Sequence, residues 1–118
     1  MSQWKWNDVT LEIQMSKVDF QKKYEDAFAV CAEEEKQLQK AGKLHEISRA
    51  YCNMMFHLFD NIFGEGTAEK LFHGEMDTTL IEECYDSFLD AVKKDIESEN
   101  RKRISRVAKY KPKGRGRK

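Results

Sequence analysis

The chain has 118 residues, of which 40% are hydrophobic and 36% are charged, with 21 acidic and 21 Lys or Arg residues. This length suits a single domain with a real core, and the composition is too apolar for a disordered chain. No apolar run approaches the roughly 18–20 residues of a membrane span, and the first residues lack the pattern of a signal peptide. We therefore expect a cytoplasmic protein without membrane contact.

The charges are distributed unevenly along the chain. Residues 101–118 contain ten Lys or Arg and no Asp or Glu, so residues 1–100 hold 21 − 10 = 11 basic residues against 21 acidic ones, a balance of −10. We expect residues 1–100 to form a single acidic helical domain, and residues 101–118 to form a basic helix extension and a flexible tail.

The segment "WKWNDVTLEI", residues 4–13, alternates apolar and polar residues. Asn7 and Asp8 interrupt it with side chains that tolerate turn conformations. The pattern predicts a β-hairpin over about residues 3–14. Because a lone hairpin is only marginally stable in water, we expect it to pack on the helices or to pair with another chain.

Apolar residues at helical spacing predict two long helices after the hairpin. The first runs from about Asp19 to Ala41, with Ser16 or Asp19 as its N-cap and Gly42 after its end. The second runs from about Leu44 to Phe63. Its apolar stripe is wide, so we expect it to lie at the centre of the core.

A short helix over residues 68–73 should follow, with Thr67 as its N-cap and Gly74 after its end. A third long helix then carries apolar residues up to Ile96 and continues as a charged, solvated helix through Val107. Three residues are able to cap it: Asp77, Thr78 and Thr79. The ending "KPKGRGRK" is expected to form a disordered basic tail.

The expected fold is therefore mainly α. It is a helical bundle of three long helices and one short helix, preceded by an N-terminal β-hairpin and followed by a basic tail.

The stretch Gly64-Glu65-Gly66-Thr67 lies between the second and the short helix. Its glycine spacing differs from that of phosphate-binding loops, which also follow strands rather than helices, and Glu65 would repel a phosphate. The stretch instead predicts a helix corner. Gly64 takes the left-handed cap of the second helix, and Gly66 lets the chain turn into the Thr67 cap.

Residues with catalytic or metal-binding chemistry show no functional spacing. The histidines His45, His57 and His73 lack a metal-binding pattern, and His57 with Asp60 is only one pair on one helix. Three cysteines fall among apolar residues, which favours buried thiols: Cys31, Cys52 and Cys84. We therefore expect no catalytic residues, no cofactor and no metal, and a protein that is not an enzyme.

The basic segment has several interpretations. Its cations suit the phosphates of nucleic acid, an acidic partner, or the acidic body of a neighbouring copy, and they also suit a tail that only increases solubility. The candidate contact residues are Arg101, Lys102, Arg103, Arg106, Lys109, Lys111, Lys113, Arg115, Arg117 and Lys118.

The stretch "FDNIFGEGTAEKLFHG" resembles the middle of small tail assembly chaperones from long-tailed phages and prophages of Gram-positive bacteria. In these proteins an apolar helix ends in Phe-Gly-Glu-Gly, followed at once by a short amphipathic helix and another glycine. The corresponding residues here are Phe63, Gly64, Glu65, Gly66, Thr67, Ala68, Leu71, Phe72 and Gly74. The opening "WKWNDVTLEI" and the later "YDSFLDAV" extend the resemblance over about residues 3–95, whereas the basic end has no counterpart.

The resemblance implies a non-enzymatic role in the cytoplasm of the bacterial host. Such chaperones bind the long helical tape measure protein, keep it soluble and help to recruit the tail tube protein, and relatives can form multimers. It implies an apolar partner-binding groove for which the candidates are Trp4, Trp6, Met54, Met55, Phe59, Phe63, Leu71 and Phe72. Filling the monomer core is the alternative role for each of them.

Two other functions stay open at this point. The first is a phage nucleic-acid-associated protein that acts through its basic tail. The second is an inhibitor of a host defence protein that uses the acidic body to mimic a nucleic-acid surface.

Overall fold

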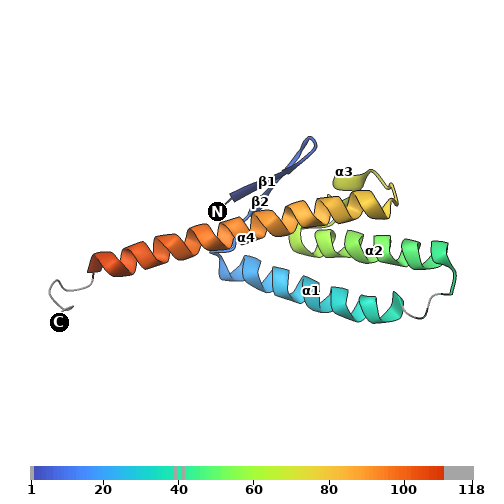
Figure 1. Ribbon diagram of the computed structural model, residues 1–118, viewed down its shortest axis with the longest axis horizontal. Coiled ribbons are helices and arrows are strands. Elements are labelled where there is room, and N and C mark those ends of the chain that lie inside the picture. Colours follow the sequence, from blue (N-terminus) through green and yellow to red (C-terminus); the bar gives the residue numbers. More distant parts are fainter. Residues whose placement is uncertain (1, 39, 41, 111–118) are drawn as a thin grey trace.

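The computed structural model describes residues 2–38, 40 and 42–110, and the side chains of these residues up to 108. Two strands, β1 (Ser2–Trp6) and β2 (Val9–Ile13), precede the helices α1 (Val18–Leu38), α2 (Leu44–Phe63), α3 (Thr67–Phe72) and α4 (Thr78–Tyr110) (Figure 1). The mainly helical fold with an N-terminal hairpin is thus confirmed. The predicted disordered tail lies outside the described residues.

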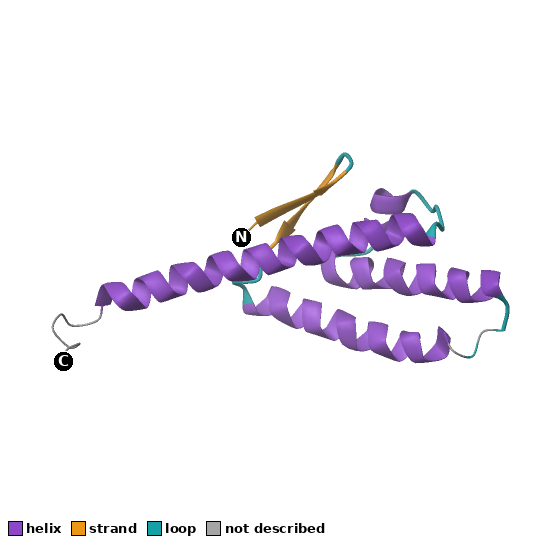
Figure 2. Cartoon of the chain, in the orientation of Figure 1, coloured by secondary structure: helices purple, strands orange, loops and turns teal. Residues whose placement is uncertain are grey.

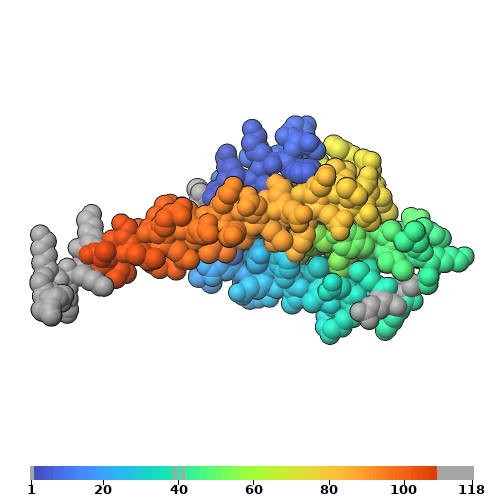
Figure 3. All heavy atoms as spheres, in the orientation of Figure 1, coloured from blue at the N-terminus to red at the C-terminus, as the bar shows by residue number. Residues whose placement is uncertain are grey.

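The molecule is elongated, with extents of 66 × 32 × 23 Å. Helices α1 and α2 run antiparallel to each other and α4 lies along both, while the hairpin packs on α4 from the opposite side (Figure 2). The end of α4 extends alone beyond this body (Figure 3). We call residues 97–110 the arm.

The hairpin has an apolar face and a polar face. Its antiparallel register pairs Trp4 with Leu11 and Trp6 with Val9, so all four side chains lie on the same face. Asn7 has a φ of 55°, which asparagine tolerates better than most residues. The two-residue turn expected at Asn7 and Asp8 is therefore confirmed.

The core is built around α2, as its wide apolar stripe indicates. This helix contributes six buried residues: Cys52, Met54, Met55, Leu58, Phe59 and Ile62. Helix α4 adds Ile81, Cys84, Phe88 and Val92, which recur at helical spacing. Helix α1 contributes only Ala27 to the fully buried set, so it covers the core more loosely.

The ends of α1 differ from the expected ones. The helix begins at Val18, so neither Ser16 nor Asp19 is the residue immediately before it. Asp19 lies in the first turn, where its negative charge favours the helix dipole. The helix ends at Leu38, before the expected Ala41, and Gly42 stands two residues before the start of α2.

The corner between α2 and α3 exists, but two of its expected details are wrong. Gly64 follows α2 with φ 118° and ψ 156°, which is outside the left-handed helical region, and Gly66 is the left-handed residue. Thr67 is the first residue of α3 rather than its cap, and its hydroxyl donates to the Gly64 carbonyl at 2.7 Å. The capping oxygen comes from α2, because Asp60 Oδ1 accepts from the Ala68 N–H at 2.8 Å.

Asp77 caps α4, as one of the three expected residues. Its Oδ1 accepts hydrogen bonds from the N–H groups of Thr79, at 3.0 Å, and Leu80, at 3.3 Å. At the end of α3, His73 takes the left-handed conformation at the C-cap, and Gly74 follows with a φ of 77°. The short helix therefore ends one residue before its predicted last residue.

Candidate protein-interaction site

Most of the predicted partner-binding residues lie in the core. Six of them are buried: Trp4, Met54, Met55, Phe59, Leu71 and Phe72. The Trp4 ring stacks 5.7 Å from Phe59 and 6.0 Å from Phe63, and lies 5.2 Å from Phe88. Trp6 and Phe63 are half-buried. In this conformation these residues join the hairpin to the bundle and do not form an exposed groove.

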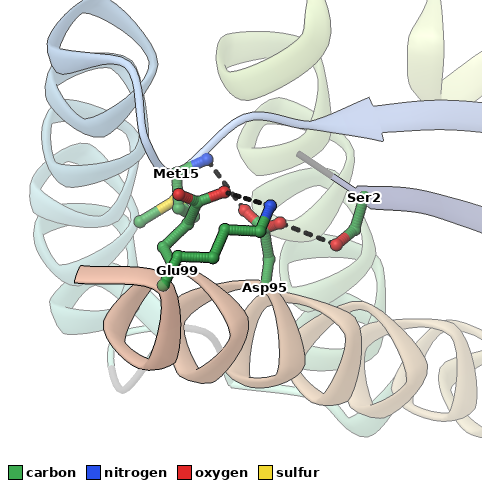
Figure 4. A network of polar contacts seen from close by, with 5 residues as sticks. Ser2, Met15, Asp95 and Glu99 are labelled. Atoms are coloured by element: carbon green, nitrogen blue, oxygen red, sulfur yellow. Dashed lines mark hydrogen bonds and ion pairs between the residues drawn. The ribbon is translucent and has the colours of Figure 1, made fainter. Parts of the chain in front are cut away.

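A buried carboxylate fastens the hairpin to α4. The Asp95 side chain is fully buried, and it accepts hydrogen bonds from the Ser2 hydroxyl at 2.6 Å and from the Met15 N–H at 3.0 Å. Figure 4 shows it pointing from α4 towards both ends of the hairpin. Burial alone would raise the pKa of Asp95, but the hydrogen bonds from Ser2 and Met15 stabilise the charged form and hold the pKa below its usual value.

The spacing of the buried residues along α4 is the sequence signal for Asp95. Ile81, Cys84, Phe88 and Val92 form the buried stripe of α4, and position 95 continues that spacing. An acidic residue at a core position needs hydrogen-bond donors. The pattern therefore indicates an inward-facing carboxylate, although it does not say which residues donate to it.

Exposed aromatic surface remains where α1 meets α4. Tyr24 and Phe28 of α1 are half-buried, with ring centroids 4.7 Å apart. Phe28 lies 6.4 Å from the half-buried Tyr85 of α4, and Tyr24 lies 6.2 Å from Phe88. We call Tyr24, Phe28 and Tyr85 the aromatic face. Burial raises the pKa of both tyrosine hydroxyls.

The described part of the predicted basic contact set lies on the arm. Arg101, Lys102, Arg103 and Arg106 are exposed, and Lys109 belongs to the same helix. The side chain of Lys109 and the whole of residues 111–118 lie outside the description. Among the described residues, Lys102 approaches Glu99 at 3.7 Å, and no ion pair is seen for Arg101, Arg103 or Arg106.

The arm also carries apolar side chains in solvent. Ile104 is 68% exposed and Val107 is 57% exposed. They line a shallow hollow together with Asn100, Arg103 and Ala108. From the sequence, Ile104 and Val107 were expected only to lie on a solvated helix. Their helical spacing, on a segment from residue 101 onward without any acidic residue, is the signal for an apolar contact.

The histidines and cysteines singled out in the sequence do not form a catalytic or metal-binding cluster in the part of the chain that the structure describes. His57 Nδ1 lies 2.7 Å from Glu34 Oε2, while Asp60 caps α3, so these two residues do not act together. Cys52 and Cys84 are buried as expected, and Cys31 is half-buried. Burial raises the pKa of Cys84 to about 12. The described residues contain no group of three or more His, Cys, Asp or Glu that could hold a metal ion.

Within the described residues, no helix is both long enough and apolar enough to cross a membrane. Residues 7–118 match the model of a family of unknown function, DUF6673, and the chain therefore belongs to that family. The comparison with curated proteins found no match. The comparison with solved structures found none either.

Proposed function

We propose that this member of the DUF6673 family is a phage tail assembly chaperone, which binds the tape measure protein and assists the assembly of the tail tube without catalysing a reaction. Support comes from the resemblance of residues 3–95 to such chaperones. The small helical body with its leading hairpin is consistent with that resemblance.

The observation that carries the proposal is the aromatic face. Tyr24, Phe28 and Tyr85 come from two helices and are packed against each other, yet each remains partly open to solvent. A helix with an apolar stripe would bury these rings by lying along them. Aromatic rings of this kind supply much of the binding energy of protein interfaces, because each one offers a large and rigid apolar area.

A protein partner of this type matches the chemistry of a tape measure protein. A long helical protein that is not yet assembled exposes apolar stripes and is prone to aggregate. The aromatic face would cover part of such a stripe, while the many charged residues of the body would keep the complex soluble. Tight catalytic geometry is unnecessary for this task.

The proposal is tested by co-expressing the chain with a tape measure protein and a tail tube protein of a long-tailed phage of Gram-positive bacteria. We expect co-purification and a higher soluble yield of the tape measure protein. Tyr85→Ala should reduce both, whereas Tyr85→Phe should retain them because the ring is kept. Val18→Ala is the matched control, since Val18 is an exposed apolar residue on α1 outside the aromatic face.

Three results would overturn the proposal. They are the absence of any complex with either phage protein, an unchanged solubility of the tape measure protein, or equal binding by Tyr85→Ala and the wild type. Circular dichroism of each variant separates a loss of binding from a loss of folding.

A second candidate function is nucleic-acid association through the arm. The exposed Arg101, Lys102, Arg103 and Arg106 favour it, because cations on one helix neutralise phosphates without reading the bases. Phosphate contacts give no role to the exposed Ile104 and Val107, however. These two side chains favour a protein partner for the arm.

A further inference from the structure

We propose that the arm of one copy docks on the acidic end of a second copy, so that the chains assemble head to tail. The acidic end is defined by the exposed carboxylates of Glu65, Glu69, Glu75, Asp77, Glu82, Glu83, Asp86 and Asp90. They lie on the corner between α2 and α3, on α3, on the loop after it and on the first half of α4.

The two ends carry mostly opposite charges, although Arg49 of α2 lines the hollow beside Met76. Residues 65–90 contain eight acidic residues and only one Lys or Arg, Lys70. Asp90 pairs with Lys94 at 3.0 Å. The other carboxylates of the acidic end are exposed to solvent. Residues 101–110 contain five Lys or Arg and no acidic residue. The arm of one copy is therefore attracted to the acidic end of another copy.

These charges do not neutralise one another within a single chain. Both groups lie on α4, and Figure 1 shows this helix running without a break from the acidic end to the arm. From Glu82 to Arg103 it rises by roughly 30 Å. That distance is several times the Debye length of about 8 Å at physiological salt, so the attraction is satisfied only between copies.

Both ends also expose apolar side chains. On the arm these are Ile104 and Val107. At the acidic end, Leu44 is 81% exposed and Met76 is 43% exposed, and both line a second shallow hollow with His45, Ser48 and Arg49. Met76 stands between Glu75 and Asp77 in the chain. Each end thus combines an apolar centre with charged neighbours, which is the composition of a protein interface.

A second copy suits the arm better than the other occupants do. Pairing of two arms would bring like charges together, which is unfavourable. Nucleic acid would use the cations and leave Ile104 and Val107 exposed. The acidic end of another copy would pair with the cations of the arm and also cover its exposed Ile104 and Val107.

Because the two contacting surfaces differ, the contact is heterologous. Repeated head-to-tail contacts produce a ring when the rotation closes and an open chain when it does not. This inference does not depend on tape measure binding, since it uses neither Tyr24 nor Phe28 nor Tyr85.

Sedimentation velocity of the full chain, freed of nucleic acid, tests the proposal. We expect concentration-dependent assembly at low ionic strength, and monomers at about 1 M salt, where the Debye length is about 3 Å. Arg103→Glu with Arg106→Glu should abolish assembly, and so should Glu75→Lys with Glu82→Lys. A mixture of these two double variants should assemble again, because the reversed arm positions then meet the reversed end positions and the unchanged arm meets an unchanged end.

The matched control is Lys17→Glu with Lys23→Glu, which changes the net charge as much as the arm variant does but alters exposed positions near α1. It should assemble like the wild type. The proposal is overturned by a wild type that is monomeric at all concentrations, by assembly that survives the arm variant, or by a mixture of the two double variants that stays monomeric. Monomers that associate only after a duplex oligonucleotide is added also overturn it, and assign the arm to nucleic acid.

Discussion

The Ser2 hydroxyl donates a hydrogen bond of 2.6 Å to the carboxylate of Asp95, although 93 positions separate the two residues in the chain. The other carboxylate oxygen accepts from the Met15 N–H at 3.0 Å. One buried side chain on α4 thereby holds the first residue of β1 and the segment just after β2. This attachment keeps Trp4 packed on Phe59 and Phe88.

Replacing Asp95 should loosen the hairpin. Asp95→Asn keeps one acceptor oxygen but places a neutral amide, with its own donors, beside the Ser2 and Met15 donors. Because hydrogen bonds to a charged group contribute about 1.5–3 kcal/mol, we expect the free energy of unfolding to fall by about 1–3 kcal/mol. Urea denaturation measures the free energy of unfolding. Asp90→Asn, an exposed change on the same helix, should alter it by less than about 0.5 kcal/mol.

The contribution of Asp95 should also depend on pH. Its pKa in the folded protein lies below the ordinary value of 3.8, so the unfolded chain binds the proton more tightly. The stabilisation is therefore complete well above pH 3.8 and is lost as the pH falls through the lower pKa of the folded protein. Melting temperatures from neutral to acid pH should show the wild type and Asp95→Asn converging. A constant difference down to the lowest pH would contradict this assignment.

Gly64→Ala should destabilise the protein through the backbone alone. Its φ of 118° and ψ of 156° fall in a region that is almost restricted to glycine, whereas a Cβ there would meet no atom within 4 Å. We expect a loss of about 1–3 kcal/mol in the free energy of unfolding. In Gly42→Ala the new Cβ meets only the end of the Glu46 side chain, at 4.0 Å, and we expect little change. Similar losses in both variants would contradict the strain at Gly64.

Asp60→Ala should remove the cap of α3. The Ala68 N–H would lose its acceptor, and cap deletions cost about 0.5–2 kcal/mol. Hydrogen exchange of the α3 amides should be faster in this variant, while exchange in α1 should not change. Asp60→Asn keeps an acceptor oxygen and should retain most of the protection. If α3 exchanges equally in all three proteins, Asp60 does not cap it.

The three thiols should react in a fixed order. Cys31 is half-buried and therefore accessible to a reagent, whereas Cys52 and Cys84 are buried. Burial raises the pKa of all three thiols, and that of Cys84 reaches about 12. Since the thiolate is the reactive form, iodoacetamide at mildly alkaline pH should modify Cys31 first. Cys52 and Cys84 should react only after denaturant is added. Timed labelling followed by peptide mass spectrometry gives the order, and early labelling of Cys84 would indicate an open core.

The local order of elements could be predicted from the sequence because it depends on neighbouring residues. Alternation around Asn7 and Asp8 predicts the hairpin, and helical spacing predicts the helices with an error of a few residues at their ends. The separation of charge between residues 1–100 and 101–118 is likewise a property of the sequence. From this separation of charge alone, docking on a neighbouring copy was already one of the possible roles of the basic segment.

Only the tertiary structure decided which apolar residues are available to a partner. Helical spacing places Met54, Met55 and Phe59 on one apolar stripe of α2. It cannot say whether other parts of the same chain or another protein cover that stripe. Here the chain itself buries all three residues. The capping of Ala68 by Asp60 and the burial of Asp95 depend on contacts between separate elements. Such contacts are set by how the helices pack, whereas turns and helical periodicity are set by residues that are neighbours in the chain.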